Sequence, residues 1–327
     1  MLARWMTHAL AALTLLLGAR TAGAQLADAA PEWYLRGSGG CRLFVQEFGR
    51  GRDTLVILHG GWGSEHSYLF DALRGLEGRY HLVLYDQRGS LRSPCADRLV
   101  TVDAHVADLE RLRAQLRLER MTLVGHSNGT LLATLYLARH PDRVRGLVLT
   151  GPGMVVPRTP VTPEDSALAA AQSEAMAAFL ERPEIAAELR RQGLVGNASA
   201  LSDAQLTAAW RIQFAGANLY HVDRWRQVKG GQVFWSRAAA EAAARSMPAT
   251  YDFVPALKAH RCPVWVIVGD HDFGTGTVAL QRHWVREVPR ARFVVIERAG
   301  HEAWIDAPEE FRRVFGEALR SAATCAG

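Results

Sequence analysis

The stretch Met121-Thr-Leu-Val-Gly-His-Ser-Asn-Gly-Thr130 decides the fold. It indicates a short apolar strand that runs into Gly125-His-Ser-Asn-Gly129, and an apolar helical pattern begins near Leu131. A G-x-S-x-G sequence between a strand and a helix is typical of a nucleophile elbow, because small residues let the chain turn sharply around the serine. The serine then projects from the sheet edge at a helix N-terminus, whose dipole favours developing negative charge. We therefore predict that Ser127 is a nucleophile.

The first 24 residues form a signal-peptide pattern. Arg4 precedes an apolar run over residues 9–17, and Ala22-Gly-Ala24 supplies a cleavage site of small residues. The run is shorter than the roughly 20 apolar residues that cross a bilayer. We therefore expect cleavage between Ala24 and Gln25, no stable membrane insertion afterwards, and a secreted or periplasmic protein.

The composition narrows the class of protein. Apolar residues make up 49% of the 327-residue chain, as in a globular protein with a well-buried core. The net charge is +5, but no run of clustered Lys and Arg with interleaved aromatic residues is present, so we expect no nucleic-acid partner. Four cysteines follow the signal segment: Cys41, Cys95, Cys262 and Cys325. An exported protein permits two disulfides among three possible connectivities, and the spacings do not resemble a zinc site.

Strands and helices alternate along residues 25–154. An early hairpin signal predicts strands over 33–36 and 42–48. Continuous apolar runs then predict buried strands over 54–58, 81–85, 121–124 and 144–150, with helical patterns over 68–76 and 102–115. This order predicts an α/β fold with a mostly parallel, doubly wound sheet and ligand chemistry at the carboxyl ends of its strands.

The pattern changes over residues 155–250. Buried strands disappear, and alanine-rich helical stretches are expected over 164–180, 184–191, 203–219 and 234–245. Prolines punctuate both ends of this region. We interpret it as a helical cap inserted into the core. The core then resumes over residues 251–327, with strands over 262–268 and 292–296, a helix around Trp284 and a last helix over 308–319.

Three polar residues follow strands of this core in the order Ser127, Asp272, His301. This is the serine–acid–histidine order of the α/β-hydrolase fold, in which such residues meet at one sheet edge. We expect His301 to remove the Ser127 proton and later protonate the leaving group, while Asp272 orients the imidazole. Asp270 is the alternative acid, and we favour Asp272 because it lies two residues further from the strand end.

An oxyanion intermediate requires two N–H donors. Asn128, the residue after the nucleophile, should supply one donor. Gly61, in the loop after the first parallel strand, should supply the other, because a glycine lets the backbone approach a substrate closely. We expect the nearby histidines to be structural hydrogen-bonding groups: His59, His126 and His271.

The mature chain resembles, over essentially its whole length, α/β-hydrolases of the proline iminopeptidase-like group, peptidase family S33. The matching pieces are His59-Gly-Gly-Trp-Gly63, Asp86-Gln-Arg-Gly-Ser-Leu-Arg-Ser93, the elbow, Gly269-Asp-His-Asp272 and Ala299-Gly-His301. The resemblance implies hydrolysis of an N-terminal residue, often proline, from short peptides, without a metal or an organic cofactor. It also implies the disulfides Cys41–Cys95 and Cys262–Cys325, because that fold brings each pair to the same edge of the sheet.

The chain departs from the family pattern at several positions. Trp62 replaces a proline, Leu91 replaces a glycine, and the elbow is GHSNG, which is widespread among esterases, rather than GGSWG. The tryptophan–glutamate element of the cap that binds the substrate amine is also missing, since Trp210 is followed by Arg211. A peptidase would need another carboxylate to pair with the ammonium group. Two acidic residues of the cap are candidates, Glu174 and Asp223.

These observations leave three functions open. The first is a serine hydrolase that acts as an aminopeptidase on short peptides. The second is a carboxylesterase or lactonase that acts on small esters, which the GHSNG elbow favours. The third is a ligand-binding protein that keeps the fold without catalysis, and an intact triad argues against it. Epoxide hydrolases and dehalogenases need a carboxylate nucleophile, and this chain has Ser127 at that position.

Overall fold

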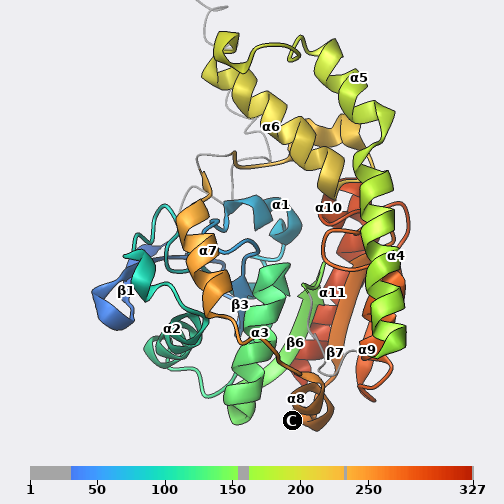
Figure 1. The fold of residues 1–327 in the computed structure, drawn as a ribbon. Coiled ribbons are helices and arrows are strands. Elements are labelled where there is room, and N and C mark those ends of the chain that lie inside the picture. The colour runs from blue at the N-terminus through green and yellow to red at the C-terminus, as the bar shows by residue number, and fades with distance from the viewer. Residues whose placement is uncertain (1–30, 154–161, 232–233, 326–327) are drawn as a thin grey trace, which may run out of the picture.

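The sheet of the computed structural model confirms the predicted fold (Figure 1). The structure describes residues 31–153, 162–231 and 234–325, so the predicted signal peptide lies outside it. In this part of the chain, eight strands have the order β1-β2-β4-β3-β5-β6-β7-β8. Strand β2 pairs antiparallel with β1 and β4, and the remaining neighbours pair parallel. The strands are β1 (Glu32–Arg36), β2 (Arg42–Phe48), β3 (Asp53–Leu58), β4 (Tyr80–Tyr85), β5 (Met121–His126), β6 (Val144–Thr150), β7 (Val264–Gly269) and β8 (Ala291–Ile296).

Two apolar cores cover the two faces of the sheet. Successive strand side chains alternate between them, so Val56 and Leu58 of β3 enter one core while Leu55 and Ile57 enter the other. This explains why β3 is a continuous apolar run in the sequence. The first core includes side chains of α2 (Val102–Gln115), α3 (Asn128–Arg139), α8 (Val254–Ala259) and α9 (Val278–Val285). The second includes side chains of α1 (Phe70–Leu73), α10 (Ala303–Asp306) and α11 (Pro308–Thr324).

Three helices follow β6: α4 (Pro163–Leu180), α5 (Pro183–Arg191) and α6 (Asp203–Asn218). Helices α5 and α6 lie at the top of Figure 1, and α4 runs from there down the right-hand side beside the core. Both α4 and α6 begin at a capping box, formed by Thr162 with Asp165 and by Ser202 with Gln205. Helix α4 also packs against α9 of the core. These helices match three of the four stretches expected in the cap.

The fourth stretch packs elsewhere. Helix α7 (Arg237–Ser246) contacts α2, and its buried alanines join the first core. The expected cap range 155–250 therefore includes one helix that belongs with the core. Helix α7 also starts later than residue 234, because the Ser236 hydroxyl caps it by accepting a hydrogen bond from Ala239 N–H. An alanine-rich pattern predicts a helix without indicating its packing partner, which explains the difference.

Several short elements were not expected from the sequence. The predicted helix over 68–76 consists of the 3-10 helix η2 (Ser67–Leu69) followed by the single turn α1. Helices α8 and α10 are also short, and short segments carry little periodicity. The other 3-10 helices are η1 (Ser38–Gly40), η3 (Asp97–Leu99), η4 (Pro141–Arg143), η5 (Ala198–Ala200) and η6 (Val222–Gln227).

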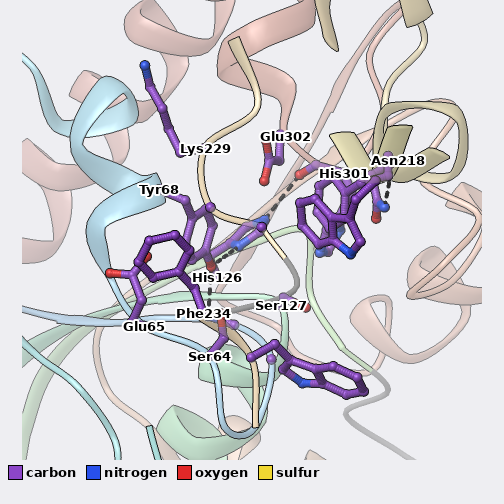
Figure 2. Close-up of a pocket in the computed structure, with 17 residues that line it drawn as sticks. Ser64, Glu65, Tyr68, His126, Ser127, Asn218, Lys229, Phe234, His301 and Glu302 are labelled. Carbon is purple, nitrogen blue, oxygen red and sulfur yellow. Dashed lines mark hydrogen bonds between the residues drawn. The ribbon is translucent and has the colours of Figure 1, made fainter. Parts of the chain in front are cut away.

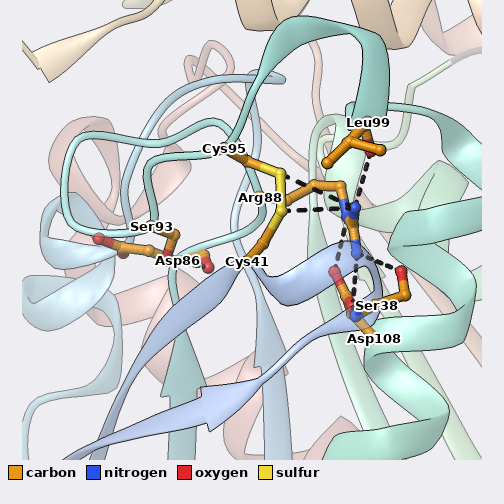
Figure 3. The surroundings of a disulfide bond; sticks show 8 residues. All are labelled: Ser38, Cys41, Asp86, Arg88, Ser93, Cys95, Leu99 and Asp108. Carbon is orange, nitrogen blue, oxygen red and sulfur yellow. Dashed lines mark hydrogen bonds and ion pairs between the residues drawn. A yellow bond between two sulfur atoms is a disulfide. The ribbon is translucent and has the colours of Figure 1, made fainter.

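Two disulfides join Cys41 to Cys95 and Cys262 to Cys325, the pairs that the family resemblance implies. The first lies against the buried Arg88 (Figure 3). The Arg88 guanidinium donates two hydrogen bonds of 2.7 Å to the Asp108 carboxylate. It also donates to Ser38 Oγ and to the Leu99 carbonyl, each at 2.7 Å. The arginine of the Asp86–Ser93 motif is therefore a structural residue that fastens the loop after β4.

None of the helices within 31–153, 162–231 and 234–325 combines the length and the apolar character that a membrane span needs.

Candidate active site

Ser127 occupies a sharp turn between β5 and α3. Its backbone has φ 54° and ψ −126°, a region that non-glycine residues rarely adopt and that is often found at functional sites. The neighbouring glycines allow close packing: a Cβ on Gly125 would lie 2.7 Å from the Gly129 carbonyl oxygen, and a Cβ on Gly129 would overlap the Leu58 carbonyl. The G-x-S-x-G spacing thus has a steric cause in this structure.

His301 and Asp272 form a buried pair after β8 and β7. The His301 Nδ1 and Asp272 Oδ2 atoms are 2.9 Å apart, and the Thr275 hydroxyl donates to the same carboxylate oxygen at 2.9 Å. Gly151, which follows β6, leaves room for this pair: a Cβ there would lie 2.9 Å from His301 Nδ1. Each group therefore comes from a different strand exit, as the parallel sheet predicts.

Asp270 has a different set of partners. Its Oδ1 lies 2.7 Å from His271 Nδ1 and accepts the Ala299 N–H at 3.1 Å. These contacts make Asp270 a residue that fastens the turn after β7 to the loop before His301. The structure brings Asp272, and not Asp270, to His301.

The surroundings of His301 stabilise its charged form. Burial alone would lower the pKa of His301, but the charge of Asp272 and the hydrogen bond to it raise this pKa above its ordinary value. The backbone of His301 is also held, since its N–H donates to the Asn218 carbonyl at 2.6 Å. The Asp306 carboxylate accepts the N–H groups of Gly300 and Tyr220 at 2.8 Å each. The end of α6 and the following residues therefore help to position the histidine loop.

His126 links the elbow to the loop after β3. Its Nε2 lies 3.1 Å from the His301 carbonyl and its Nδ1 lies 2.7 Å from the Tyr68 hydroxyl, which accepts the Gly60 N–H at 2.7 Å. All of these hydrogen bonds can form at once if the neutral His126 ring donates from Nε2 and accepts at Nδ1. Burial keeps the ring neutral by lowering the pKa of His126 well below its usual range. We infer a structural role for His126.

His59 fixes the other end of the same loop. Its Nδ1 lies 2.8 Å from the Gly60 carbonyl, and its Nε2 accepts the Gln87 N–H at 3.0 Å. The Gln87 side chain returns a hydrogen bond of 2.8 Å to the His59 carbonyl. The Gly60–Gly61 backbone, with φ 66° at Gly61, is therefore held beside Ser127 from both sides.

A cavity of about 270 Å³ opens above Ser127 (Figure 2). Ser127, His301, Gly60 and Gly61 line it, and Asn128 follows Ser127 as the first residue of α3. Aromatic rings supply much of the rest of the wall: Trp210 and Phe214 from α6, with Phe234 and Trp235 before α7. The volume is near the lower end of ordinary ligand pockets, so the cavity suits a small substrate group.

The acidic residues of this cavity differ from those expected. Asp223 lines a separate cavity of about 830 Å³ among α4, α5 and η6, away from Ser127. Glu174 lines neither cavity. Instead, Glu65, Glu302 and Lys229 are the residues with ionisable acidic or lysine side chains that line the Ser127 cavity. In the sequence, the only signal for Glu302 is its position directly after His301.

No metal site accompanies this cavity in the described ranges, which contain no group of three His, Cys, Asp or Glu side chains placed to hold an ion.

Comparisons with known proteins identify the family of this fold. Residues 53–308 match the model of the alpha/beta hydrolase fold family. A proline iminopeptidase from Lactobacillus helveticus is 27% identical over 281 residues, covering 82% of this chain and 90% of the relative.

Solved structures are similar along most of the chain. A proline iminopeptidase-related protein from Thermus thermophilus superposes with a TM-score of 0.62 at 29% identity, over 91% of this chain and 100% of the other. An esterase from Thermogutta terrifontis superposes with a TM-score of 0.65 at 22% identity, over 90% and 100%. The esterase likeness concerns the fold alone.

Proposed function

The chain belongs to the alpha/beta hydrolase fold family, and on this premise we propose that it is an exported serine hydrolase with the triad Ser127, His301 and Asp272. The substrate class that we propose is short peptides with a free N-terminus, cleaved in the manner of a proline iminopeptidase. The observation that carries the proposal is the 2.9 Å contact between His301 Nδ1 and Asp272 Oδ2 beside the strained Ser127 turn. The similarity to proline iminopeptidases supports the choice of substrate.

The proposed reaction has two halves. His301 takes the Ser127 proton as the hydroxyl oxygen attacks the scissile carbonyl carbon, and it then protonates the departing amine. Water, activated by the same imidazole, hydrolyses the resulting acyl-enzyme and regenerates Ser127. Asp272 stabilises the imidazolium formed in each half, which accords with the raised pKa of His301.

Two backbone donors would bind the oxyanion. Asn128 N–H lies in the first turn of α3, where the helix dipole also favours negative charge. The Gly60 N–H is already donated to the Tyr68 hydroxyl, so Gly61 is the better second donor. A carbonyl oxygen between these two groups would gain charge in the transition state without reorganisation of the protein.

A carboxylesterase or lactonase is the second candidate. The observation that favours it is the elbow sequence, in which His126 and Asn128 stand where the peptidase pattern has glycine and tryptophan. Both candidates use the same triad, so they differ only in the acyl and leaving groups that the cavity accepts.

A substrate panel separates the candidates. We expect the wild-type protein to hydrolyse proline arylamides as well as nitrophenyl esters, and Ser127→Ala to lose both activities by at least about 10³-fold. Turnover of esters without turnover of arylamides would reject the aminopeptidase. Activity that survives Ser127→Ala would reject the serine mechanism.

A further inference from the structure

We propose that Glu302 is the residue that binds the ammonium group of the substrate, so that the cavity selects small acyl groups carrying a free α-amine. The proposal rests on the proposed function, because it assigns a binding role within the same cavity. Glu302 follows His301 directly, and its side chain lines the cavity that contains Ser127 (Figure 2). It is only 3% exposed, so a substrate group in contact with it is largely withdrawn from water.

The two carboxylates of the cavity differ in what already binds them. Glu65 accepts hydrogen bonds of 2.7 Å from both the N–H and the hydroxyl of Ser67, and it pairs with Arg92 at 2.8 Å. The Glu302 carboxylate has no ion pair or hydrogen bond with any residue that the structure describes. A buried carboxylate without a partner is costly, and a cationic ligand would relieve that cost. Glu302 is therefore the carboxylate that remains available to a substrate.

The electrostatics of Glu302 suit an amine. Burial raises the pKa of Glu302 to about 8; the positive form of His301 opposes this shift, while Asp306 and Asp71 add to it. An α-amino group has a pKa of about 8 as well. Because the two pKa values are nearly equal, the transfer of a proton from Glu302 to the substrate amine costs little free energy. An incoming amine can therefore form the carboxylate–ammonium pair close to neutral pH. The charged pair then gains from the low dielectric of the buried site.

The rest of the cavity is compatible with a cationic group. The aromatic rings of Trp210, Phe214, Phe234 and Trp235 line it, and aromatic faces attract cations. The positive charge of Lys229 would repel a substrate ammonium group. However, the Lys229 side chain is half exposed and its Nζ lies 3.5 Å from the Asp71 carboxylate, which offsets that charge. The small volume admits an amino acid side chain more readily than a long acyl chain.

Binding to a catalytically silent protein tests Glu302 independently of turnover. We would titrate the full-length mature Ser127→Ala protein at pH 8 with L-prolinamide and, separately, with N-acetyl-L-prolinamide, using calorimetry. Prolinamide should bind about ten- to a hundredfold more tightly, because charge-assisted hydrogen bonds to a buried carboxylate are strong. Adding Glu302→Gln should remove this preference while thermal unfolding shows that the variant is folded.

Glu65→Gln is the matched control, since it removes a carboxylate from the same cavity and should keep the preference for the free amine. The proposal is overturned by equal binding of the two amides, by binding of neither, or by a preference that survives Glu302→Gln. Failure of the proposed function gives a different result, namely a wild-type protein that does not hydrolyse arylamides. In a wild-type protein that does, Glu302→Gln should raise KM for arylamides about ten- to a hundredfold. KM for nitrophenyl acetate, which has no amine to pair with Glu302, should rise much less than KM for arylamides.

Discussion

The loops at the carboxyl ends of the strands (the strand exits) and the helices α4–α6 contribute differently to the cavity above Ser127. The exits of β5, β7 and β8 carry Ser127, Asp272 and His301 on elements whose backbones pack closely. Helix α6 contributes the rings of Trp210 and Phe214 to the wall, and no carboxylate of α4–α6 reaches it. The carboxylate that we assign to substrate binding, Glu302, also lies on the strand-exit side. Both the proposed chemistry and the proposed amine recognition therefore come from the closely packed strand exits, whereas α6 supplies aromatic surface.

The largest effect should come from the acid at the strand exit. Asp272→Asn should lower kcat by about 10⁴-fold, because an amide in place of the carboxylate favours the wrong imidazole tautomer. Asp270→Asn is the matched control, since Asp270 contacts His271 and the Ala299 N–H rather than His301. Steady-state kinetics with an ester and an arylamide measures both. Equal losses for the two variants would contradict the assignment of Asp272.

Removal of a disulfide should affect the two regions unequally. Both disulfides join core elements, and the sequence of α4–α6 contains no cysteine. The double substitution Cys41→Ala and Cys95→Ala should lower the free energy of unfolding by about 4 kcal/mol, from loop entropy in the unfolded chain. The KM of the protein that remains folded should not change. Guanidinium unfolding and kinetics test this, and mass mapping of non-reduced peptides would expose any other pairing.

A substitution that crowds the Asp272–His301 pair should lower kcat less than the loss of the Asp272 carboxylate does. Gly151→Ala places a Cβ 2.9 Å from His301 Nδ1 and 3.2 Å from Asp272 Oδ2, at a residue with φ 48°. Displacement of the pair should lower kcat by about 10²-fold. Gly274 is the control: it lies in the loop after β7, and a Cβ there meets no atom within 4 Å, so Gly274→Ala should retain activity. An unchanged kcat for Gly151→Ala would show that this edge of the sheet is less rigid than the packing indicates.

The pH dependence of kcat/KM and of KM should separate the role of Asp272, which acts on His301, from that of Glu302, which binds the substrate amine. Asp272 raises the pKa of His301, and His301 must be neutral to accept the Ser127 proton, so kcat/KM for every substrate should fall below a pKa above 6.5. Glu302 and a substrate amine, each with a pKa of about 8, share one proton in the bound pair. Binding must release a proton below pH 8 and take one up above it. We therefore expect KM for arylamides to be lowest near pH 8, with no such minimum for esters or after Glu302→Gln.

The motifs at the strand exits were sufficient to predict much of the fold and the site. The strands, the elbow around Ser127 and the choice of Asp272 over Asp270 depend on local patterns and on the rule that parallel strands end at one edge. Glu302 could not be predicted, because the cavity that it lines is formed together with residues distant in sequence, such as Trp210 and Phe214 of α6. The packing of α7 on α2 was missed for the same reason. Glu174 and Asp223, the candidates for pairing with a substrate ammonium group, do not line the Ser127 cavity, and no spacing in the sequence supported either of them.

The central claim is that Ser127 is the nucleophile, and covalent labelling tests it most directly. The mature protein would be incubated with a fluorophosphonate, digested and analysed by mass spectrometry, with Ser127→Ala as the control. We predict a single adduct on the peptide that contains Ser127, together with loss of hydrolytic activity in proportion to labelling. An unlabelled Ser127 in an inactivated protein, or full activity after stoichiometric labelling of Ser127, would contradict the account.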